Sequence, residues 1–345
     1  MMDELLLLTA GQSPRLQSVL HYALDRLPWR SALPGESLRG RKLVFAAALD
    51  RFGPGEDFCR LLRTLRASED GLDGASAALL IDGAGEGGTK AAARALVLAA
   101  NGAGCAFPGK PLVEGTGSLH NLDVLSRNMG LSQAETYRET ARALLRRLSG
   151  FSPPKPERPR VLMLHASDHA TSNTLALGGA LRGRLEPDIA FEELSLRNGA
   201  VFDCRGCSYT VCSHYAKSQS CFYGGSIVDE VYPALMRAGA LLLLLPNYND
   251  SVSANIMAFI NRLTSLQLFH DLGEKYLFAV VVSGYSGGDL VAQQALGALC
   301  LNKGFLLPPR FCLMETANDP GAALAAPGVA QRLDAFANRI REVLL

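Results

Sequence analysis

The second half of the sequence alternates between short, continuously apolar runs and longer segments in which apolar residues recur at helical spacing. A short apolar run between turn residues is typical of a buried parallel strand, whereas apolar positions three and four residues apart indicate an amphipathic helix. Strands joined by helices form a parallel sheet covered on both faces, so the pattern predicts an α/β fold. The predicted strands are 160–165, 188–194, 238–245, 276–282 and 311–315, and the predicted helices are 172–185, 227–236, 253–269, 289–303 and 329–344.

The first half of the chain repeats this pattern in a shortened form, at an offset of 200 residues. Residues 81–88 align with residues 281–288 through a glycine-rich loop, and Gly104 aligns with Gly304. An alternative interpretation is that two α/β domains share generic strand–loop–helix sequence. The common offset through two separate loops favours a tandem duplication whose N-terminal copy has been trimmed.

A proline-rich segment separates the two halves. Residues 151–159 contain four prolines, and proline lacks the backbone N–H that helices and sheets require. We therefore expect a degenerate domain at 1–150, an exposed linker at 151–159 and a complete domain at 160–345. With 345 residues, 48% of them hydrophobic, the chain is long and apolar enough for two cores.

The charge balance and the length of the apolar runs exclude several classes of function. The formal net charge is +1, which offers no basic face for nucleic acid or for an anionic membrane. The leucine-rich run at 238–246 is far shorter than the roughly 20 residues of a transmembrane helix, and no secretory signal is visible. The sequence therefore predicts a cytoplasmic protein that binds neither nucleic acid nor a membrane.

Three polar loops, 166–174, 245–254 and 283–289, follow predicted strands of the second half. The carboxyl ends of parallel strands meet at one edge of a sheet, where open α/β sheets bind their ligands. Hydroxyl groups and helix-start N–H groups in the first loop suit a phosphate, although an ordinary capped helix has similar residues. The second loop offers an aromatic ring and amides to a flat ligand, and the glycines of the third permit close approach of the backbone.

Together the three loops resemble those of NADPH-dependent FMN reductases and iron–sulfur flavoproteins. Ser167 and the run 172–174 resemble the phosphate loop of that family, Pro246 and Tyr248 its second flavin loop, and residues 284–288 its third. The resemblance covers residues 160–345 and implies a flavodoxin-like doubly wound sheet, bound FMN and NAD(P)H as hydride donor. It implies an FMN-dependent NAD(P)H oxidoreductase that passes electrons to a small molecule or a protein acceptor. The residues expected to bind the cofactor are Ser167, His169, Ser172, Asn173, Thr174, Pro246, Asn247, Tyr248, Asn249, Ser283, Gly284, Tyr285 and Gly287.

The first loops of both halves depart from the family pattern. In the second half, residues 166–169 read Ala-Ser-Asp-His where the family often has Gly-Ser-Pro-Arg. In the first half, the corresponding residues 9–15 lack the Ser-Asn-Thr run, and the second loop at 49–55 has no amide side chain. We therefore predict that the N-terminal domain is a degenerate copy that does not bind FMN.

Four of the eight cysteines lie within 18 residues. Cys204, Cys207, Cys212 and Cys221 are separated by two, four and eight residues, and four thiolates bind a [4Fe–4S] cluster or zinc. The family resemblance implies the cluster, because iron–sulfur flavoproteins have a compact cysteine motif at this place. The gaps are wider than in that motif, so zinc, free thiols and a redox pair stay open as alternatives.

Two questions of assembly and class also stay open. Flavin sites of this family commonly lie at a dimer interface. We therefore expect either a monomer in which the degenerate half covers the site as an intrachain pseudo-dimer, or a homodimer in which a second copy covers it. The alternative to an enzyme is a metal-binding or partner-binding protein, or a pure electron carrier, on a duplicated flavodoxin-like scaffold.

Overall fold

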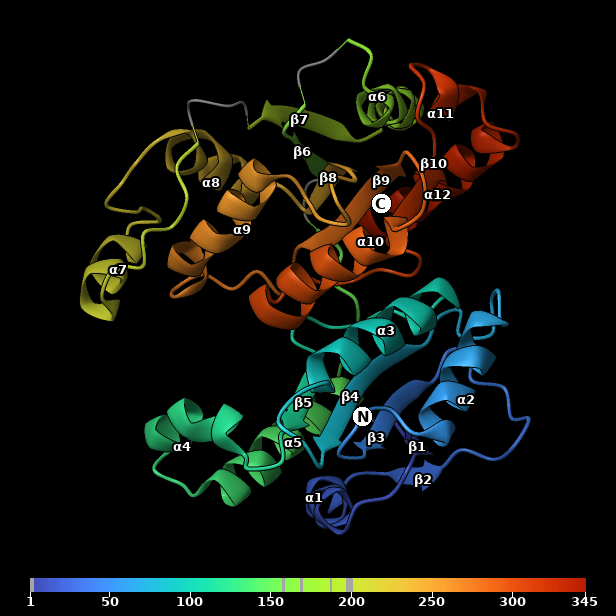
Figure 1. The fold of residues 1–345 in the computed structure, drawn as a ribbon, viewed down its shortest axis with the longest axis vertical. Coiled ribbons are helices and arrows are strands. Elements are labelled where there is room, and N and C mark those ends of the chain that lie inside the picture. The colour runs from blue at the N-terminus through green and yellow to red at the C-terminus, as the bar shows by residue number, and fades with distance from the viewer. Residues whose placement is uncertain (1–2, 157–158, 168–169, 187, 197–200) are drawn as a thin grey trace. The chain divides into compact units, whose positions relative to one another are not determined.

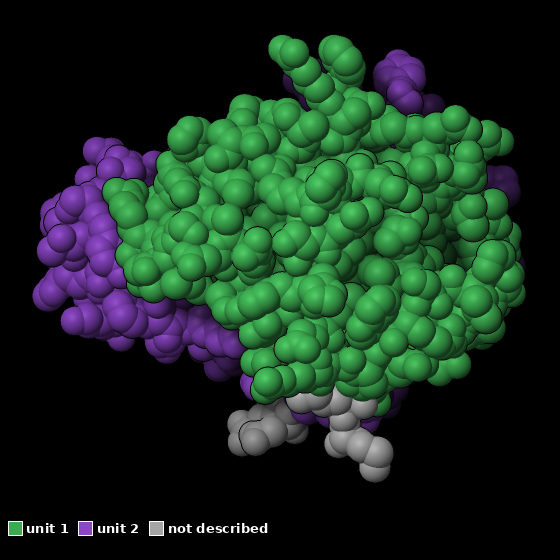
Figure 2. All heavy atoms as spheres, turned by 90° about the horizontal axis from the view of Figure 1, so that it is seen from below, with its two compact units in different colours: residues 1–152 green, residues 153–345 purple. Residues whose placement is uncertain are grey.

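The computed structural model describes residues 3–156, 159–167, 170–186, 188–196 and 201–345. The chain divides into two compact units, Met1–Ser152 and Pro153–Leu345, which Figure 2 shows in different colours. The division falls within the proline-rich segment 151–159. Each unit contains one parallel five-stranded sheet with helices between its strands (Figure 1).

The sheet of the C-terminal unit has the strand order of a doubly wound fold. Its order is β7-β6-β8-β9-β10, which is 2-1-3-4-5 when the strands are numbered within the unit, and this is the flavodoxin-like order. The direction of winding reverses between β6 and β8, and ligands bind beside such a reversal. The strands are β6 (Arg160–His165), β7 (Ala190–Ser195), β8 (Ala240–Pro246), β9 (Tyr276–Ser283) and β10 (Cys312–Thr316).

Helices connect these strands and form two groups. One group consists of α6, which contacts α11 and α12, and the other includes α9, which contacts α7 and the π-helical turn η3 that follows α10. Right-handed crossovers on both sides of the winding reversal place helices on both faces of the sheet. The helices are α6 (Asn173–Leu185), α7 (Tyr209–Ala216), α8 (Tyr232–Arg237), α9 (Ala254–Gln267), α10 (Gly288–Leu296), α11 (Ala322–Ala325) and α12 (Val329–Leu344), with π-helical turns η2 (Ile227–Val231) and η3 (Gly297–Lys303).

The predicted elements of this unit are present, with shifted ends. The leucine-rich run forms the central strand β8, in which six of seven residues are buried, as expected for a strand covered on both faces. The predicted helix at 289–303 is α-helical only to Leu296 and continues as η3. Helix α7, capped by Ser208, was not predicted. Among the described residues no helix combines the length and hydropathy that crossing a bilayer requires, and the cytoplasmic location stays a prediction.

The N-terminal unit has the same strand order, β2-β1-β3-β4-β5, and is therefore a shorter version of the same fold. Its strands are β1 (Leu5–Ala10), β2 (Trp29–Ser31), β3 (Lys42–Leu49), β4 (Ser76–Gly83) and β5 (Leu112–Gly115). Its helices are α1 (Pro14–Leu24), α2 (Glu56–Arg66), α3 (Thr89–Gly102), η1 (His120–Leu122), α4 (Asp123–Met129) and α5 (Gln133–Ser149).

Details of the backbone repeat between the units at the offset seen in the sequence. An isolated bridge joins Ser76 to Ala106 in one unit, and another joins Tyr276 to Leu306 in the other. Lys110 and Arg310 adopt left-handed φ values of 52° and 50°, which are uncommon for residues other than glycine. The two units therefore share unusual local geometry as well as topology, and a tandem duplication is the hypothesis that explains it.

Candidate functional site

The candidate cofactor site is the edge of the C-terminal sheet where β6, β8 and β9 end. These three strands are neighbours in the sheet, so the loops that follow them lie at one edge. The segment after β10 reaches the same edge, because the N–H of Ala317 donates to the carbonyl of Ser283 at 2.9 Å. We call this region the C-terminal strand-end edge.

The first loop is fixed at both of its ends. Ser167 is buried, and its N–H donates to Nδ1 of His165 at 3.3 Å. Ser172 caps α6 by accepting a hydrogen bond from the N–H of Leu175 at 3.3 Å, and its hydroxyl lies 2.9 Å from that of Thr174. Asp168 and the candidate residue His169 lie outside the described residues. The loop therefore leads into a capped helix start, the arrangement that suits an anion.

Asn173 has a different role from the one expected of a phosphate ligand. Its Nδ2 donates to the carbonyl of Asp319 at 2.9 Å, and its Oδ1 accepts from the N–H of Ala323 at 3.3 Å. Both ends of the amide are thus engaged by the segment after β10. The side chain fastens that segment to the start of α6, and its contribution to a cofactor site is to hold two parts of the edge together.

The second loop is a tight turn. Tyr248 and Ser251 exchange two backbone hydrogen bonds of 3.1 Å, and the two central residues, Asn249 and Asp250, have φ values of 52° and 58°. Positive φ at both central positions defines a type I′ turn, for which Asn and Asp are among the favoured residues. The turn leaves the Tyr248 ring 53% exposed, so its face is accessible to a ligand.

The second and third loops are bonded to each other. The Nδ2 of Asn247 donates to Oγ of Ser283 and to the carbonyl of Ser286, both at 3.1 Å. Gly287, which caps α10 with a φ of 91°, lies so close to the second loop that a Cβ there would be 2.0 Å from Oδ1 of Asp250. A Cβ there would displace Asp250, and the positive φ also favours glycine, so Gly287 allows the two loops to approach closely.

One buried polar atom of these two loops, the Oδ1 of Asn247, has no hydrogen-bond partner among the described residues. Buried acceptors in folded proteins are nearly always paired. The exposed ring of Tyr285, next to Gly284, adds a second accessible aromatic face. An unpaired acceptor, two aromatic faces and a capped helix start fit a cofactor that has a flat ring with an N–H group and a phosphate.

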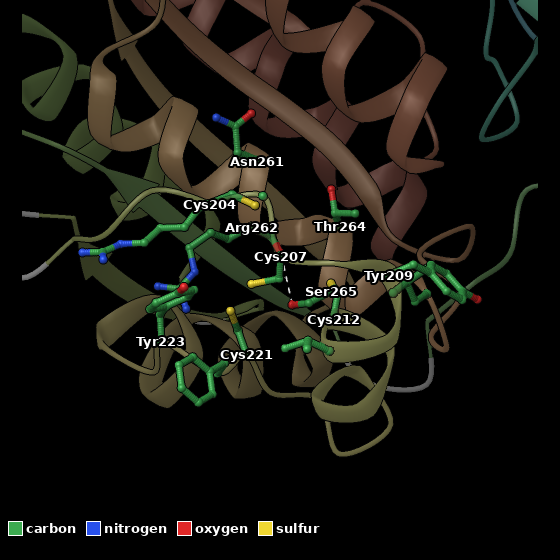
Figure 3. Close-up of a pocket in the computed structure, with 15 residues that line it drawn as sticks. Cys204, Cys207, Tyr209, Cys212, Cys221, Tyr223, Asn261, Arg262, Thr264 and Ser265 are labelled. Carbon is green, nitrogen blue, oxygen red and sulfur yellow. Dashed lines mark hydrogen bonds between the residues drawn. The ribbon is translucent and has the colours of Figure 1, made fainter.

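The four clustered cysteines line a second site, which we call the cysteine pocket. This pocket has a volume of about 310 Å³, and all four sulfur-bearing side chains contribute to its wall (Figure 3). Burial raises the pKa of the Cys212 thiol, and the nearby thiols of Cys221, Cys204 and Cys207 raise it further. The cysteines are therefore neighbours in space, as their clustering in the sequence suggested.

The described residues give no support for the expected metal site, which stays a prediction. Within the described residues, no group of three or more His, Cys, Asp or Glu side chains is placed to hold a metal ion. The wide gaps spread the cysteines over a loop, helix α7 and the segment beyond it, and Cys204 is exposed. Single-ion ligation by Cys204, Cys207, Cys212 and Cys221, as zinc would require, is thus not supported.

Arg262, which was not among the site residues expected from the sequence, also lines the cysteine pocket. Arg262 lies on α9 among the buried residues of that helix and is itself only 2% exposed. A signal was present, because Arg262 follows Phe259 by three residues and therefore falls on the apolar face. A charged residue on an otherwise apolar helix face is a candidate for function.

The fold and the edge define a class of protein. A parallel sheet of order 2-1-3-4-5 with polar and glycine-containing loops at its carboxyl edge is a flavodoxin-like domain. Residues 159–319 match the family model described as NADPH-dependent FMN reductase. This match spans most of the C-terminal half of the chain and confirms the resemblance to NADPH-dependent FMN reductases seen in the loops.

Solved structures with similar folds cover about half of the chain. An azoreductase from Bacillus anthracis str. Sterne is 12% identical over 53% of this chain and 99% of its own, with a TM-score of 0.41. An NAD(P)H:quinone oxidoreductase from Methanothermobacter marburgensis is 17% identical over 54% and 94%, with a TM-score of 0.39. A flavodoxin from the domain Archaea is 12% identical over 53% and 98%, with a TM-score of 0.34. No curated protein sequence matches the chain.

Proposed function

We propose that this chain binds FMN at the C-terminal strand-end edge and oxidises NAD(P)H there, passing the electrons to a small acceptor. The observation that supports this most directly is the buried, unpaired Oδ1 of Asn247 at the end of β8, within the segment that matches the FMN reductase family model. When bound, FMN supplies the redox chemistry, as it accepts a hydride and releases electrons. The protein supplies binding and orientation.

In this proposal the first loop holds the phosphate. The N–H groups at the start of α6 and the hydroxyl groups of Ser167, Ser172 and Thr174 are the donors. Ser172 and Thr174 are bonded to each other, so a phosphate would bind to a pre-formed arrangement. Asn173 keeps the adjoining segment in place through Asp319 and Ala323, and His169 stays a sequence prediction.

The second and third loops hold the ring. Tyr248 and Tyr285 present ring faces, and residues 283–287 bring backbone close to the ligand. The Oδ1 of Asn247 accepts a hydrogen bond from an N–H on the polar side of the flavin ring, while its Nδ2 remains bonded to Ser283. Asn249 and Pro246 shape the turn that positions Asn247. In this proposal Asn247 accepts the hydrogen bond from the flavin ring, and the other residues hold Asn247 in place or lie against the ring.

The domain roles follow from the same proposal. The C-terminal domain binds the cofactor, and the N-terminal domain is the degenerate copy without FMN. The proposal does not include a [4Fe–4S] cluster on the four cysteines, for which the described residues give no support. The reaction we propose therefore needs only NAD(P)H, FMN and a small acceptor.

The test is to measure cofactor content and turnover with a matched pair of variants. The purified protein should show a flavin absorption spectrum and oxidise NAD(P)H in the presence of a quinone or an azo dye. N247L should weaken FMN binding by roughly tenfold or more, because it removes a buried hydrogen-bond acceptor worth roughly 1–3 kcal/mol. N338L, on the exposed side of α12, should leave FMN binding unchanged.

Three outcomes would change this conclusion. Protein that is colourless and takes up no added FMN would favour a metal-binding or partner-binding module. Protein that binds FMN but oxidises NAD(P)H very slowly would favour an electron carrier. Iron and acid-labile sulfide in protein purified without air would mean that the protein contains an iron–sulfur cluster, which would then have to be included in the electron transfer.

A further inference from the structure

The guanidinium of Arg262 is buried and only partly satisfied. Its Nη1 donates to the carbonyl of Phe202 at 3.3 Å. Its Nε and Nη2 have no hydrogen-bond partner within the described residues, and Arg262 is the only described side chain with two such atoms. Burying a charged group without a partner is strongly unfavourable, so this arrangement calls for an anion that supplies the missing contacts.

The helix segment around Arg262 is bonded to a neighbouring helix and to the loop before Cys204. The hydroxyl of Tyr232 donates to the carbonyl of Arg262. The Nδ2 of the adjacent Asn261 donates at 3.0 Å to Oδ1 of Asp203, which also accepts from the N–H of Cys204. The loop that bears the first cysteines is therefore fastened to α9, and the guanidinium is bonded to the same loop through the carbonyl of Phe202.

The two free donors are the pair that recognises a carboxylate. Nε and Nη2 lie on one edge of the planar guanidinium and match the two oxygens of a carboxylate. The same chain shows this pairing elsewhere: Nε of Arg332 donates to Oε1 of Glu315 at 2.6 Å, and Nη2 donates to Oε2 at 2.7 Å. Arg262 has the same edge buried, and no acidic side chain among the described residues occupies it.

The residues that line the cysteine pocket indicate the charge, polarity and size of its ligand. Among the described residues that line it, none is Asp or Glu, and the charged ones are Arg262 and Arg205. Arg205 lies over the ring of Tyr223 at 5.0 Å. The rest of the wall is mainly aromatic, aliphatic and sulfur-containing, as Figure 3 shows for the four cysteines and the tyrosines. A volume of about 310 Å³ is at the lower end of the roughly 300–1,000 Å³ typical of small-molecule sites.

We propose that the cysteine pocket binds a small molecule with one carboxylate and a flat apolar body, and that Nε and Nη2 of Arg262 donate hydrogen bonds to the carboxylate. The apolar body lies against the aromatic rings and the sulfur atoms, which make favourable contacts with each other. The site is separate from the FMN edge, because Arg262 is nine residues beyond the N-cap Ser253 of α9, roughly 13 Å along the helix. The proposal does not depend on FMN binding.

The probe is benzoate, with neutral benzamide as the isostere that lacks the charge. Calorimetric titration of the full chain should show binding of benzoate and much weaker binding of benzamide. R262M should weaken benzoate binding at least about tenfold, because a charge-assisted bidentate contact is lost. R262K keeps the positive charge but lacks the two parallel N–H donors of the guanidinium, so it should bind benzoate with intermediate affinity. R205Q removes the exposed cation of the same pocket and should change the affinity by less than R262M does.

Folding and cofactor content are measured on the same samples. R262M should unfold at the same or a higher temperature than the parent protein without ligand, because it removes an unsatisfied buried charge. If R262M does not fold, R262K gives the affinity comparison in its place. FMN content, read from flavin absorbance, should be equal in all variants. Its absence from all of them would contradict the proposed function and leave the pocket assignment standing.

Two results would overturn the assignment. One is benzoate binding that is absent, or equal in the parent protein and R262M. The other is iron or zinc in the parent protein that is lost from R262M, since Arg262 would then balance the charge of a metal–thiolate centre.

Discussion

The two units share a helix cap at the first strand-end loop and differ in the residue two positions after it. Ser13 and Ser172 each cap a helix by accepting from the N–H three residues later, and both distances are 3.3 Å. The second residue of the helix is Arg15 in the N-terminal unit and Thr174 in the C-terminal unit. The cap hydrogen bond is thus the same in both units, and the side chains beside it differ.

In the N-terminal unit the donors at this loop are occupied by the protein itself. The carboxylate of Asp82, only 3% exposed, accepts from Nε of Arg15 and from Oγ of Ser13, both at 2.7 Å. The other nitrogens of Arg15 donate to the carbonyls of Gly83 and Gly117 at 2.9 Å. An internal carboxylate therefore engages groups that an anionic ligand would otherwise use.

In the C-terminal unit the corresponding strand position is apolar. At the offset of 200 residues, Val282 of β9 corresponds to Asp82 of β4, and each is the last residue but one of its strand. Neither Val282 nor Thr174 brings a charge to the edge. The comparison indicates that two side chains, more than the fold, decide whether this edge accepts a phosphate.

The shape of the edge does not make the same distinction. The second loop closes a bridge in both units, Asp50 with Gly53 and Tyr248 with Ser251. The N-terminal unit, which we predict not to bind FMN, nevertheless has an open pocket of about 700 Å³ at its edge. The residues that line it include Ser13, Arg15, Asp50, Arg51 and Asp82.

The largest effect is expected from breaking the Asp82 contact. D82V, which introduces the residue of the C-terminal unit, leaves Arg15 without its carboxylate and should cost about 3 kcal/mol in free energy of unfolding. Arg15 is 30% exposed, which keeps the loss at the lower end of the range for buried pairs. Phosphate should then stabilise the variant more than the parent protein, in thermal unfolding at constant ionic strength.

A double variant is the control for this prediction. R15M/D82V removes both charges and should recover part of the lost stability without any response to phosphate. If D82V has the stability of the parent protein, or if phosphate stabilises both equally, Asp82 is not the group that prevents an anion from binding at the N-terminal edge.

A smaller effect should separate two glycines with the same backbone conformation. Gly287 and Gly88 each cap a helix with a φ of 91°, so alanine at either position costs about 1–2 kcal/mol in strain. A Cβ at Gly287 also meets Asp250, whereas nothing lies within 4 Å of a Cβ at Gly88. G287A should therefore weaken FMN binding, measured by fluorescence titration, and G88A should not. Equal FMN affinity in the two variants would contradict the assignment of the third loop.

The smallest effect concerns the shared caps. S172A should cost about 1 kcal/mol in free energy of unfolding, the usual value of a serine cap, and S13A somewhat more, because the Ser13 hydroxyl also donates to the buried Asp82. S172A should in addition lower FMN affinity by a few-fold, because the hydroxyl also lies at the proposed phosphate position. If S13A lowers FMN affinity and S172A does not, the FMN site lies in the N-terminal unit.

Much of the fold could be predicted from the sequence because its signals are local. The apolar runs identified the strands, and helix 329–344 has the predicted bounds in the structure. The cysteines were expected to gather, and they line one pocket. The short helix α7 was missed because a helix of eight residues gives too short a periodic pattern.

The sequence alone determined the parallel α/β class, the repeat at 200 residues and the loops that end each strand, since hydrophobic period and turn chemistry depend on neighbouring residues. Only the tertiary structure decided where polar side chains find their partners. Arg15 meets Asp82 across 67 residues, and Asn173 meets Asp319 across 146. The same structure leaves Arg262 buried with two donors free. Such contacts depend on which distant segments the sheet brings together, and the local pattern of a chain carries no record of that.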